Sequence, residues 1–305
     1  MVKRTLSAAE AFDLRQALHV SVLEALLASR RWEPGDLIFQ GGTSLHLAHG
    51  SPRFSEDLNF LVKSTLDLYA IGASIQARLG RSPWIPKDAK LTVSPAKEGR
   101  NPHVFDVSIG NASIIGSVRV RVELWRAPAP ALLPLAVEVR PVRLLSGPAA
   151  GAQAFVPSAT LREIYVDKVF ALAARPYLKA RDVFDLYWLA SQVNMHWLAS
   201  QVNLADTLIC SPADLEVRLA TYPSQTPQNW LTQAAKRRTE LPTQIASIQR
   251  DLARWLPSTW ALQEAQVEAM VQTSMLALDG GISSMHALAT ARQAQAAVPV
   301  KRPRR

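Results

Sequence analysis

The sequence predicts an α+β protein, in which a small mixed sheet flanked by helices is followed by a helical region. Three observations support this fold class. Short strand-like segments separated by turn residues fill most of residues 37–144. Residues 118–124 alternate valine or leucine with charged residues, which is the period of two of a strand with one buried face. Beyond Ser158 the apolar residues recur at helical spacing and prolines interrupt the pattern.

The elements of the first half follow from these patterns in chain order. Apolar positions at helical spacing predict a first helix over residues 7–31, which Pro34 and Gly35 would end. A buried strand should follow and break at Gly41 and Gly42, with a short helix after the glycines. The remaining expected elements are a strand over 57–62, a helix over about 66–79, and strands over 90–95, 103–110, 117–125 and 136–145.

Glycines and prolines between Gly147 and Pro157 predict a domain boundary. We therefore expect a sheet domain over 1–150 and a helical domain over 151–305, which ends in the basic tail "KRPRR". Breaks between the helices are expected at the prolines of this half, which are Pro176, Pro212, Pro223, Pro227, Pro242 and Pro257.

One internal repeat lies in the helical half, where "WLASQVN" occurs at 188–194 and again at 197–203. Nine residues at about 100° each amount to a net half-turn, so one continuous helix would place Trp188 and Trp197 on opposite faces. We interpret the repeat as a local duplication, and we predict a helix break near Asn194.

The composition limits the class of protein. The chain has 305 residues, of which 48% are hydrophobic, so it can form two domains with real cores. It has no apolar run near the roughly 20 residues that cross a membrane, and charged residues interrupt any signal-peptide core at its start. Cys210 is the only cysteine, which excludes an intramolecular disulfide and a cysteine-based zinc site and favours a cytoplasmic protein.

The formal net charge is +9 and the isoelectric point is about 10.0. A basic protein attracts polyanions, because each phosphate contact releases counterions. On charge alone, a solvated surface with a disordered tail is an equal alternative. The six histidines include no His-x-x-x-His pair, and we expect His46 and His49 at the surface or in a supporting position instead of on zinc.

A glycine pair follows the first predicted strand. Gly41 and Gly42 would let backbone N–H groups approach phosphate oxygens, and the start of the following helix would add its dipole. The hydroxyls of Thr43 and Ser44 could cap that helix or touch a phosphate. A plain turn between strand and helix explains the same residues without a ligand.

An acidic position follows in the next strand. A strand would place Asp57 and Asn59 on one face, where two oxygen-bearing side chains can share a Mg²⁺. Such an ion neutralises a triphosphate and polarises the phosphorus under attack. The alternative is a strand face that simply meets solvent.

The helical half carries a lysine among apolar residues. Lys168 stands beside Val169 and Phe170, and lysine avoids such neighbours unless its amine has an anionic partner. Asp182 and Asp185 share a helix face and could order Lys168, or accept a proton from an attacking hydroxyl. The alternatives are a lysine that reaches the surface, and local pairing of the aspartates with neighbouring basic residues.

These motifs together resemble the AbiEii/AbiGii-type nucleotidyltransferase toxin family, which includes the MenT toxins. "GGTSLHL" and "RFSEDLNF" are similar to that family's GGT-x-L and R-x-S-x-D-L-D-F, and "LREIYVDKVFALAARPYLKARDVFDLYWLA" is similar to its later lysine and Arg-Asp segment. The resemblance implies a polymerase-β-like nucleotidyltransferase domain. It implies nucleotide-binding positions at Gly41, Gly42, Thr43, Ser44, Arg53 and Ser55, a metal-binding acid at Asp57, and catalytic positions at Asp57, Lys168, Asp182 and Asp185, with Arg181 beside them.

The resemblance also implies an activity. The family transfers a nucleoside monophosphate from a nucleoside triphosphate (NTP) to an acceptor with the help of Mg²⁺. It implies tRNA as the acceptor, with a protein or a small molecule such as an aminoglycoside as alternatives. A cognate antitoxin of the winged-helix type is the expected protein partner.

Asn59 departs from the family pattern, which has aspartate there. A neutral amide oxygen is a poorer Mg²⁺ ligand and removes one negative charge. One metal could be held mainly by Asp57 and the nucleotide, or a carboxylate from another strand, Glu123 or Asp106, could complete the site. A third possibility is a chain that only binds nucleotide or RNA without catalysis.

Overall fold

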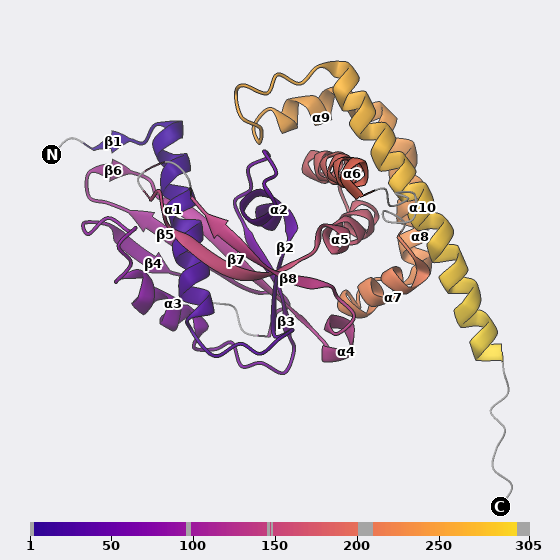
Figure 1. The fold of residues 1–305 in the computed structure, drawn as a ribbon, viewed down its shortest axis with the longest axis horizontal. Coiled ribbons are helices and arrows are strands. Elements are labelled where there is room, and N and C mark those ends of the chain that lie inside the picture. The colour runs from indigo at the N-terminus through magenta and orange to yellow at the C-terminus, as the bar shows by residue number, and fades with distance from the viewer. Residues whose placement is uncertain (1–2, 96–98, 145–146, 148, 201–209, 298–305) are drawn as a thin grey trace, which may run out of the picture. The chain divides into compact units, whose positions relative to one another are not determined.

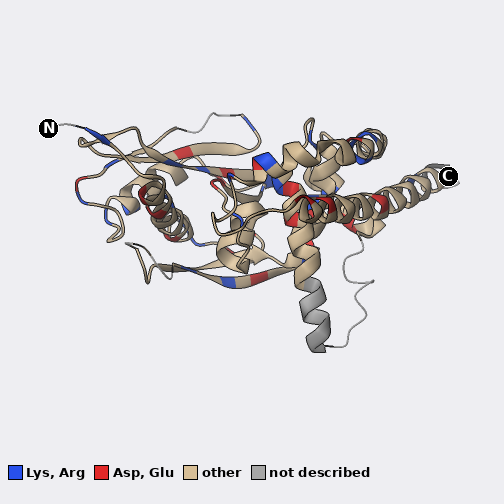
Figure 2. Ribbon diagram, turned by 90° about the horizontal axis from the view of Figure 1, so that it is seen from above, with Lys and Arg blue, Asp and Glu red and all other residues tan. Residues whose placement is uncertain are grey.

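The computed structural model describes residues 3–95, 99–144, 147, 149–200 and 210–297. The chain divides into two compact units, residues 1–160 and 161–305, which are described separately here. Lys and Arg outnumber Asp and Glu in both units, by 18 to 13 in residues 1–160 and by 16 to 12 in residues 161–305, so the net charge of +9 is shared between them. Figure 2 colours the described residues of both kinds.

The first unit contains strands and four helices among its described residues (Figure 1). Its helices are α1 (Ala8–Leu27), α2 (Gly41–His49), α3 (Ile71–Leu79) and α4 (Ala129–Leu132). Its strands are β1 (Arg4–Thr5), β2 (Leu37–Gln40), β3 (Leu58–Lys63), β4 (Lys90–Val93), β5 (His103–Gly110), β6 (Ile114–Ile115), β7 (Val118–Ala127), β8 (Val137–Arg143) and β9 (Gln153–Ala159).

Seven of these strands form one mixed sheet in the order β4-β5-β7-β3-β2-β9-β8, while β1 and β6 form a small parallel pair. Within the large sheet β3 pairs with β7 and β2 with β9 in parallel, and the other pairs are antiparallel. The mixed sheet with its helices confirms the predicted α+β fold.

The two faces of the sheet differ in polarity along β7. One face forms the core of the unit with α1 and α3, and it includes Phe39, Phe60 and Val122 at 1% exposure or less. Along β7, buried valines alternate with more exposed charged residues. These charged residues, Arg119, Arg121 and Glu123, lie on the face opposite the core. A strand with a period of two therefore separates packing from polar chemistry.

Helix α1 begins where the sequence signals it. The Ser7 hydroxyl accepts a hydrogen bond from the Glu10 N–H, and the Glu10 carboxylate accepts one from the Ser7 N–H, which is a complete capping box. The helix ends at Leu27, however, several residues before the predicted end near Pro34.

The position of strand β9 contradicts the predicted domain boundary between Gly147 and Pro157. It overlaps the stretch of glycines and prolines from Gly147 to Pro157 that we interpreted as a boundary, yet it pairs with both β2 and β8. Pro157 lies opposite Val139 of β8, and the pairing of β9 with β2 is at Ser158 and Phe39. The first compact unit ends at Thr160, about ten residues beyond the predicted division.

The second unit is helical throughout its described residues. Its elements are α5 (Leu161–Ala174), α6 (Ala180–Ser200), α7 (Pro212–Thr221), α8 (Pro227–Glu240), the 3₁₀ turn η2 (Leu241–Gln244), α9 (Ile245–Leu252) and α10 (Glu264–Ala297). The prolines act as predicted, since Pro212 and Pro227 open helices and Pro176 and Pro223 follow helix ends. None of the described helices has both the length and the apolar character needed to span a membrane.

Helix α6 contradicts the predicted break near Asn194, because it continues to Ser200. The duplicated segment contains no glycine or proline, so nothing in its local chemistry ends a helix. The end of the second copy, residues 201–203, lies outside the described residues.

Aromatic packing holds the long helix α10 in place within the unit. Trp230 of α8 is fully buried and donates a hydrogen bond from Nε1 to the Phe170 carbonyl oxygen at 3.0 Å. A Cβ at Gly281 of α10 would lie 3.0 Å from both Trp230 and Val169, so glycine permits this close approach.

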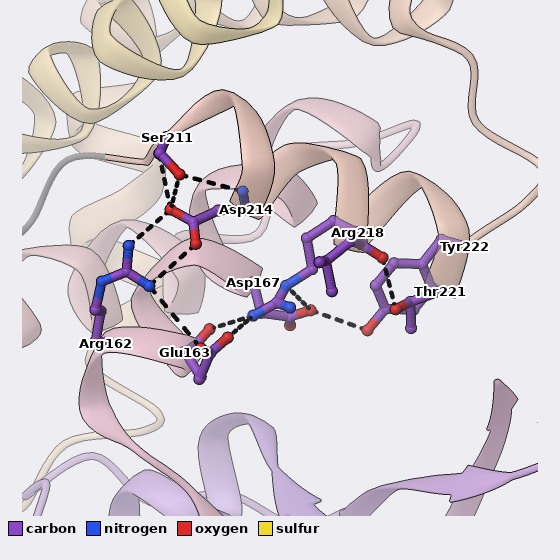
Figure 3. Close-up of polar contacts among 9 residues, drawn as sticks. Arg162, Glu163, Asp167, Ser211, Asp214, Arg218, Thr221 and Tyr222 are labelled. Carbon is purple, nitrogen blue, oxygen red and sulfur yellow. Dashed lines mark hydrogen bonds and ion pairs between the residues drawn. The ribbon is translucent and has the colours of Figure 1, made fainter. Parts of the chain in front are cut away.

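A buried polar network joins α5 to α7 (Figure 3). Arg218 is 3% exposed and donates from Nη2 to both the carbonyl oxygen and the carboxylate of Glu163 at 2.8 Å. Arg162 forms a two-bond ion pair with Asp214, which also caps the first turn of α7 together with Ser211. Charged side chains buried in this way are tolerated because they are paired.

Candidate functional site

The first group of predicted residues surrounds the corner between β2 and α2. Gln40 is the N-cap residue of the helix, and Gly41 follows with a φ of 79°. This left-handed conformation favours glycine, and a Cβ there would also come within 3.5 Å of the Asn59 side chain. The first glycine of the pair is therefore required by backbone conformation.

The second glycine is required by space. A Cβ at Gly42 would lie 2.2 Å from Arg53 Nη2 and 3.1 Å from Ser55 Oγ. Arg53 is 2% exposed and donates from Nη1 to the Phe54 carbonyl oxygen at 2.8 Å. The Arg-x-Ser part of the motif thus packs directly on the glycine pair, and a contact of Arg53 or Ser55 with nucleotide stays a prediction.

The hydroxyls after the glycines connect three elements. Thr43 Oγ1 donates to the carbonyl oxygen of Asp57 at 2.5 Å, and Ser44 Oγ lies 2.7 Å from Ser158 Oγ of β9. Neither hydroxyl caps α2, so that expectation was wrong, because both residues already lie inside the helix. Thr43 instead fixes the backbone that carries Asp57, and phosphate contacts by Thr43 and Ser44 stay predictions.

The sheet register brings together three of the polar positions. Asn59 lies between Gln40 of β2 and Glu123 of β7, and its Nδ2 donates to the Asp57 carbonyl oxygen at 3.2 Å. Of the two carboxylates considered as a third ligand, Glu123 is therefore the neighbour of Asn59. Asp106 is opposite Arg121 and accepts a hydrogen bond from its Nε at 3.0 Å.

Asp57 lines a hollow of about 370 Å³, which we call the Asp57 hollow. Its other lining residues include three arginines, Arg15 from α1 and Arg119 and Arg121 from β7. Within the described part of the chain, the Asp57 carboxylate makes no hydrogen bond and no ion pair, whereas Arg15 pairs with Glu56 at 2.9 Å. The hydrogen bond from Arg121 to Asp106 raises the pKa of Arg121, and the charges of Asp57 and Glu123 raise it further.

The three arginines were not among the residues that we predicted from sequence. The alternation of "VRVRVE" gave a usable signal, because it places Arg119, Arg121 and Glu123 on the same face of one strand. Only Glu123 was singled out there. Arg15 lies on α1 and carried no comparable signal.

The donor set near Asp57 fits Mg²⁺ in its chemistry. Asp57 and Glu123 offer carboxylate oxygens, and Asn59, whose Nδ2 is used in a hydrogen bond, offers Oδ1. Such oxygen donors are those that Mg²⁺ takes, usually with water and phosphate completing its shell. No cluster of three or more His, Cys, Asp or Glu side chains suited to a metal occurs among the described residues.

The second group of predicted residues lies in the helical unit. Lys168 is 5% exposed, and its Nζ is 2.8 Å from Asp182 Oδ1 and 2.6 Å from Asp185 Oδ2. This confirms the expected pairing of Lys168 and excludes a surface lysine. Arg175, which was not predicted, donates to Asp182 Oδ2 at 2.7 Å. Arg181 instead stacks over the ring of Trp255, with Cζ 4.2 Å from the ring centroid.

These contacts set the charge state of Asp182. Burial alone would raise the pKa of Asp182, but the charges of Lys168 and Arg175 outweigh it and hold that pKa well below its usual range. Such a carboxylate is a weak proton acceptor near neutral pH, which favours a positioning role for it. The catalytic roles of Lys168, Asp182 and Asp185 stay predictions.

Three solved structures are similar to this chain in fold. "JHP933" from Helicobacter pylori matches with a TM-score of 0.50 and 15% identity, over 96% of this chain and 100% of that one. A putative nucleotidyltransferase from H. pylori matches with a TM-score of 0.51 and 15% identity over 93% and 99% of the two chains. MenT4, a nucleotidyltransferase toxin from Mycobacterium tuberculosis, matches with a TM-score of 0.50 and 16% identity over 95% and 93%.

A search of curated proteins finds none with significant similarity to this sequence. The family model described as "Nucleotidyl transferase AbiEii toxin, Type IV TA system" does match, over residues 23–266. That range contains the glycine pair, Asp57 and the Lys168 cluster, and it covers most of both units. The chain therefore belongs to the AbiEii family of nucleotidyltransferase toxins of type IV toxin–antitoxin systems.

Proposed function

We propose that the chain transfers a nucleoside monophosphate from an NTP to an RNA acceptor, with tRNA as the acceptor, and that Asp57 is the central residue of the site. The observation that carries this proposal is the unpaired Asp57 carboxylate in a hollow lined by three arginines. The three arginines pair with Glu56 or Asp106, whereas the Asp57 carboxylate makes no hydrogen bond or ion pair within the described residues. The arrangement suits a ligand that brings both phosphates and a cation.

The chain's own residues account for much of the binding. Arg15, Arg119 and Arg121 supply positive charge to a triphosphate, and guanidinium groups suit phosphate oxygens because their donors form a rigid fork. In the reaction, the acceptor hydroxyl attacks the α-phosphorus, a new P–O bond forms, and the bond to the β-phosphate breaks. The proton of the hydroxyl passes to solvent water, and pyrophosphate is released as the leaving group.

Asp57, Asn59 and Glu123 are the residues that would hold Mg²⁺. When bound, this ion supplies charge neutralisation on the triphosphate and polarises the phosphorus under attack. Thr43 supports the arrangement, because its hydroxyl fixes the carbonyl of Asp57. Gly41 and Gly42 complete it by letting the backbone turn close to Asn59 and Arg53.

The helical unit contributes the Lys168 cluster, defined by Lys168, Asp182 and Asp185. We assign these residues to the active site because the family motif covers them and because two buried carboxylates hold one lysine. The proposal includes a role for Lys168 in the transfer reaction. It also includes a cognate winged-helix antitoxin and a cytoplasmic location, for which the family and the basic charge are the support.

The test is covalent labelling. The purified full chain is incubated with total RNA, Mg²⁺ and each of the four NTPs labelled at the α-phosphate, and the RNA is then separated. We expect label in the tRNA fraction with wild type and at least a 1,000-fold loss with Asp57→Ala, since the ligand of the charge-stabilising ion is removed. An NTP labelled at the γ-phosphate should leave the RNA unlabelled, because pyrophosphate is released.

Glu138→Ala is a matched control, since it removes a carboxylate of the same sheet from β8, outside the Asp57 hollow. It should label RNA as wild type does. If the label is found on protein and not on RNA, the acceptor is a protein and the RNA part of the proposal is wrong. NTP binding without label on any acceptor would support a purely binding function and overturn the transferase proposal.

A further inference from the structure

A second hollow, of about 330 Å³, lies in the helical unit, and we call it the α9 hollow. Its walls come from the start of α6 and from the η2–α9 segment, and they include Gln244, Ser247, Arg250, Asp251 and Arg254. None of these residues was singled out from the sequence. Polar surface predominates in the lining, whereas pockets for small molecules are mostly apolar.

Two arginines of this hollow have no partner. Arg250 and Arg254 are exposed, and neither makes a hydrogen bond, ion pair or ring contact through its side chain within the described residues. Other exposed arginines of the same unit differ, because Arg238 pairs with Asp279 and Arg292 pairs with Glu216. The one carboxylate in the α9 hollow, Asp251, does not neutralise both guanidinium groups.

The adjoining segment adds positive charge and aromatic rings. Lys179 and Arg181 add positive charge there, and burial, with the charge of Arg175 next, lowers the pKa of Lys179. Arg181 stacks on Trp255, next to Arg254. Tyr177, whose side chain is 61% exposed, has the Lys179 ammonium 5.6 Å from its ring centroid.

We propose that the α9 hollow binds the phosphate backbone of the RNA acceptor, with Arg250 and Arg254 as the phosphate contacts. The inference rests on the proposed function, because it takes the acceptor to be RNA. Unpaired arginines in a polar hollow suit phosphate and sugar, and single-stranded RNA additionally stacks its bases on exposed aromatic side chains such as Tyr177. Binding here is expected to be largely independent of base sequence, since phosphate contacts carry no sequence information.

The experiment measures RNA affinity apart from chemistry. Binding of fluorescent total tRNA to the full chain is followed by anisotropy over a range of salt concentrations, without NTP. Arg250→Gln/Arg254→Gln should weaken binding at least tenfold. The slope of log affinity against log salt should fall in magnitude by about 1.4 to 1.8, because each of the two lost phosphate contacts contributes about 0.7 to 0.9.

Two controls accompany the double variant. Arg238→Gln/Arg292→Gln removes the same number of charges from paired exposed positions of the same unit and should keep RNA affinity within about twofold. Arg250→Lys/Arg254→Lys keeps the charge and should restore most of the salt slope. Affinity for a fluorescent NTP analogue should be unchanged in all three variants.

The outcomes separate this inference from the proposed function. Weaker RNA binding by the double glutamine variant supports the inference even if wild type labels no RNA, in which case only the proposed function fails. Unchanged RNA affinity and salt slope, with RNA labelling intact, overturns the inference alone. A loss of NTP affinity, or an equal loss in the Arg238→Gln/Arg292→Gln control, also overturns it, because the hollow would then bind nucleotide or act only through net charge.

Discussion

Asp57 and Asp182 are both aspartates of the family motifs, yet their surroundings are opposite. Asp182 is 1% exposed and has each carboxylate oxygen paired, one with Lys168 and the other with Arg175. Asp57 is half-buried, and its carboxylate has no partner within the described chain although arginines line the same hollow. The comparison teaches that the same residue type can be neutralised by its neighbours in one unit and remain available to a ligand in the other.

The difference has a thermodynamic meaning. A buried ion pair with all partners in place is costly to break, because removal of one partner leaves an uncompensated charge in a poor solvent. A solvated carboxylate without a partner contributes little to folding. Stability and activity measurements on the two aspartate sites should therefore separate clearly.

The largest effect on stability is expected for Lys168→Ala. This change leaves Asp182 and Asp185 buried without their shared cation, and the free energy of unfolding should fall by about 3–5 kcal/mol. Urea denaturation followed by circular dichroism measures it. Asp57→Ala serves as the comparison and should change stability by no more than about 0.5 kcal/mol. Similar losses in the two variants would remove the distinction between the sites.

The next effect is a loss of stability in acid. His19 is fully buried in the folded chain, and burial lowers its pKa to about 4. An unfolded histidine takes up a proton below about pH 6.5, whereas folded His19 does so only near pH 4, so its contribution is complete above pH 6.5 and disappears as the pH falls to 4. This shift corresponds to about 3 kcal/mol at 1.36 kcal/mol per pKa unit.

Denaturation at a series of pH values tests this contribution. His19→Gln should flatten the decline in unfolding free energy between pH 6.5 and 4. His286→Gln is the control, since His286 is exposed on α10, and it should keep the wild-type slope. An unchanged slope in His19→Gln would contradict the assignment, and His49, whose pKa burial also lowers to about 4, would become the next group to replace.

A smaller effect is expected where the glycine pair meets the Arg-x-Ser motif. Gly42→Ala places a methyl group 2.2 Å from Arg53 Nη2, and the displaced guanidinium should cost about 1–3 kcal/mol of stability. Gly280→Ala is a matched control, because a Cβ there meets nothing within 4 Å inside a helix and should stabilise the chain by up to about 1 kcal/mol. Thermal denaturation of both variants provides the measurement. A neutral Gly42→Ala would mean that Arg53 moves freely.

The smallest effect is expected for Asn59→Asp. The change adds a charged oxygen of the same shape next to Glu123, so the Mg²⁺ concentration for half-maximal labelling of RNA should fall, by up to about tenfold. Activity at saturating Mg²⁺ should be kept or raised. A higher Mg²⁺ requirement in this variant would contradict the assignment of position 59 as a Mg²⁺ ligand.

Local patterns in the sequence predicted much of the fold. The period of two in β7, the capping residues of α1 and the prolines between the helices act over a few residues, so they can be read directly. The pairing of Lys168 with Asp182 was also within reach, because a lysine among apolar residues needs an anion. The α+β class and the order of the two halves follow from the same local signals.

Features that depend on distant residues could not be predicted in this way. Strand β9 reads as a loop because glycines and prolines surround it in the sequence, and its pairing with β2 and β8 depends on residues far away in the chain. The Asp57 hollow combines Arg15 of α1 with Arg121 of β7, more than 100 residues apart, and only the tertiary fold joins them. The packing of Arg53 on Gly42 likewise became visible only in three dimensions, although both residues lie in one motif.

The alternation along β7 also bears on how such a protein can change over generations. Val118, Val120 and Val122 are buried and carry the demands of folding, while Arg119, Arg121 and Glu123 carry charge on the other face. A substitution at one of the charged positions alters the electrostatic potential on that face of the strand and changes the packing of the buried valines little. Under the proposed function, substitutions at positions 119, 121 and 123 change the preference for nucleotide or metal while the fold of the sheet is kept. Single mutations can therefore adapt the same scaffold to a new substrate.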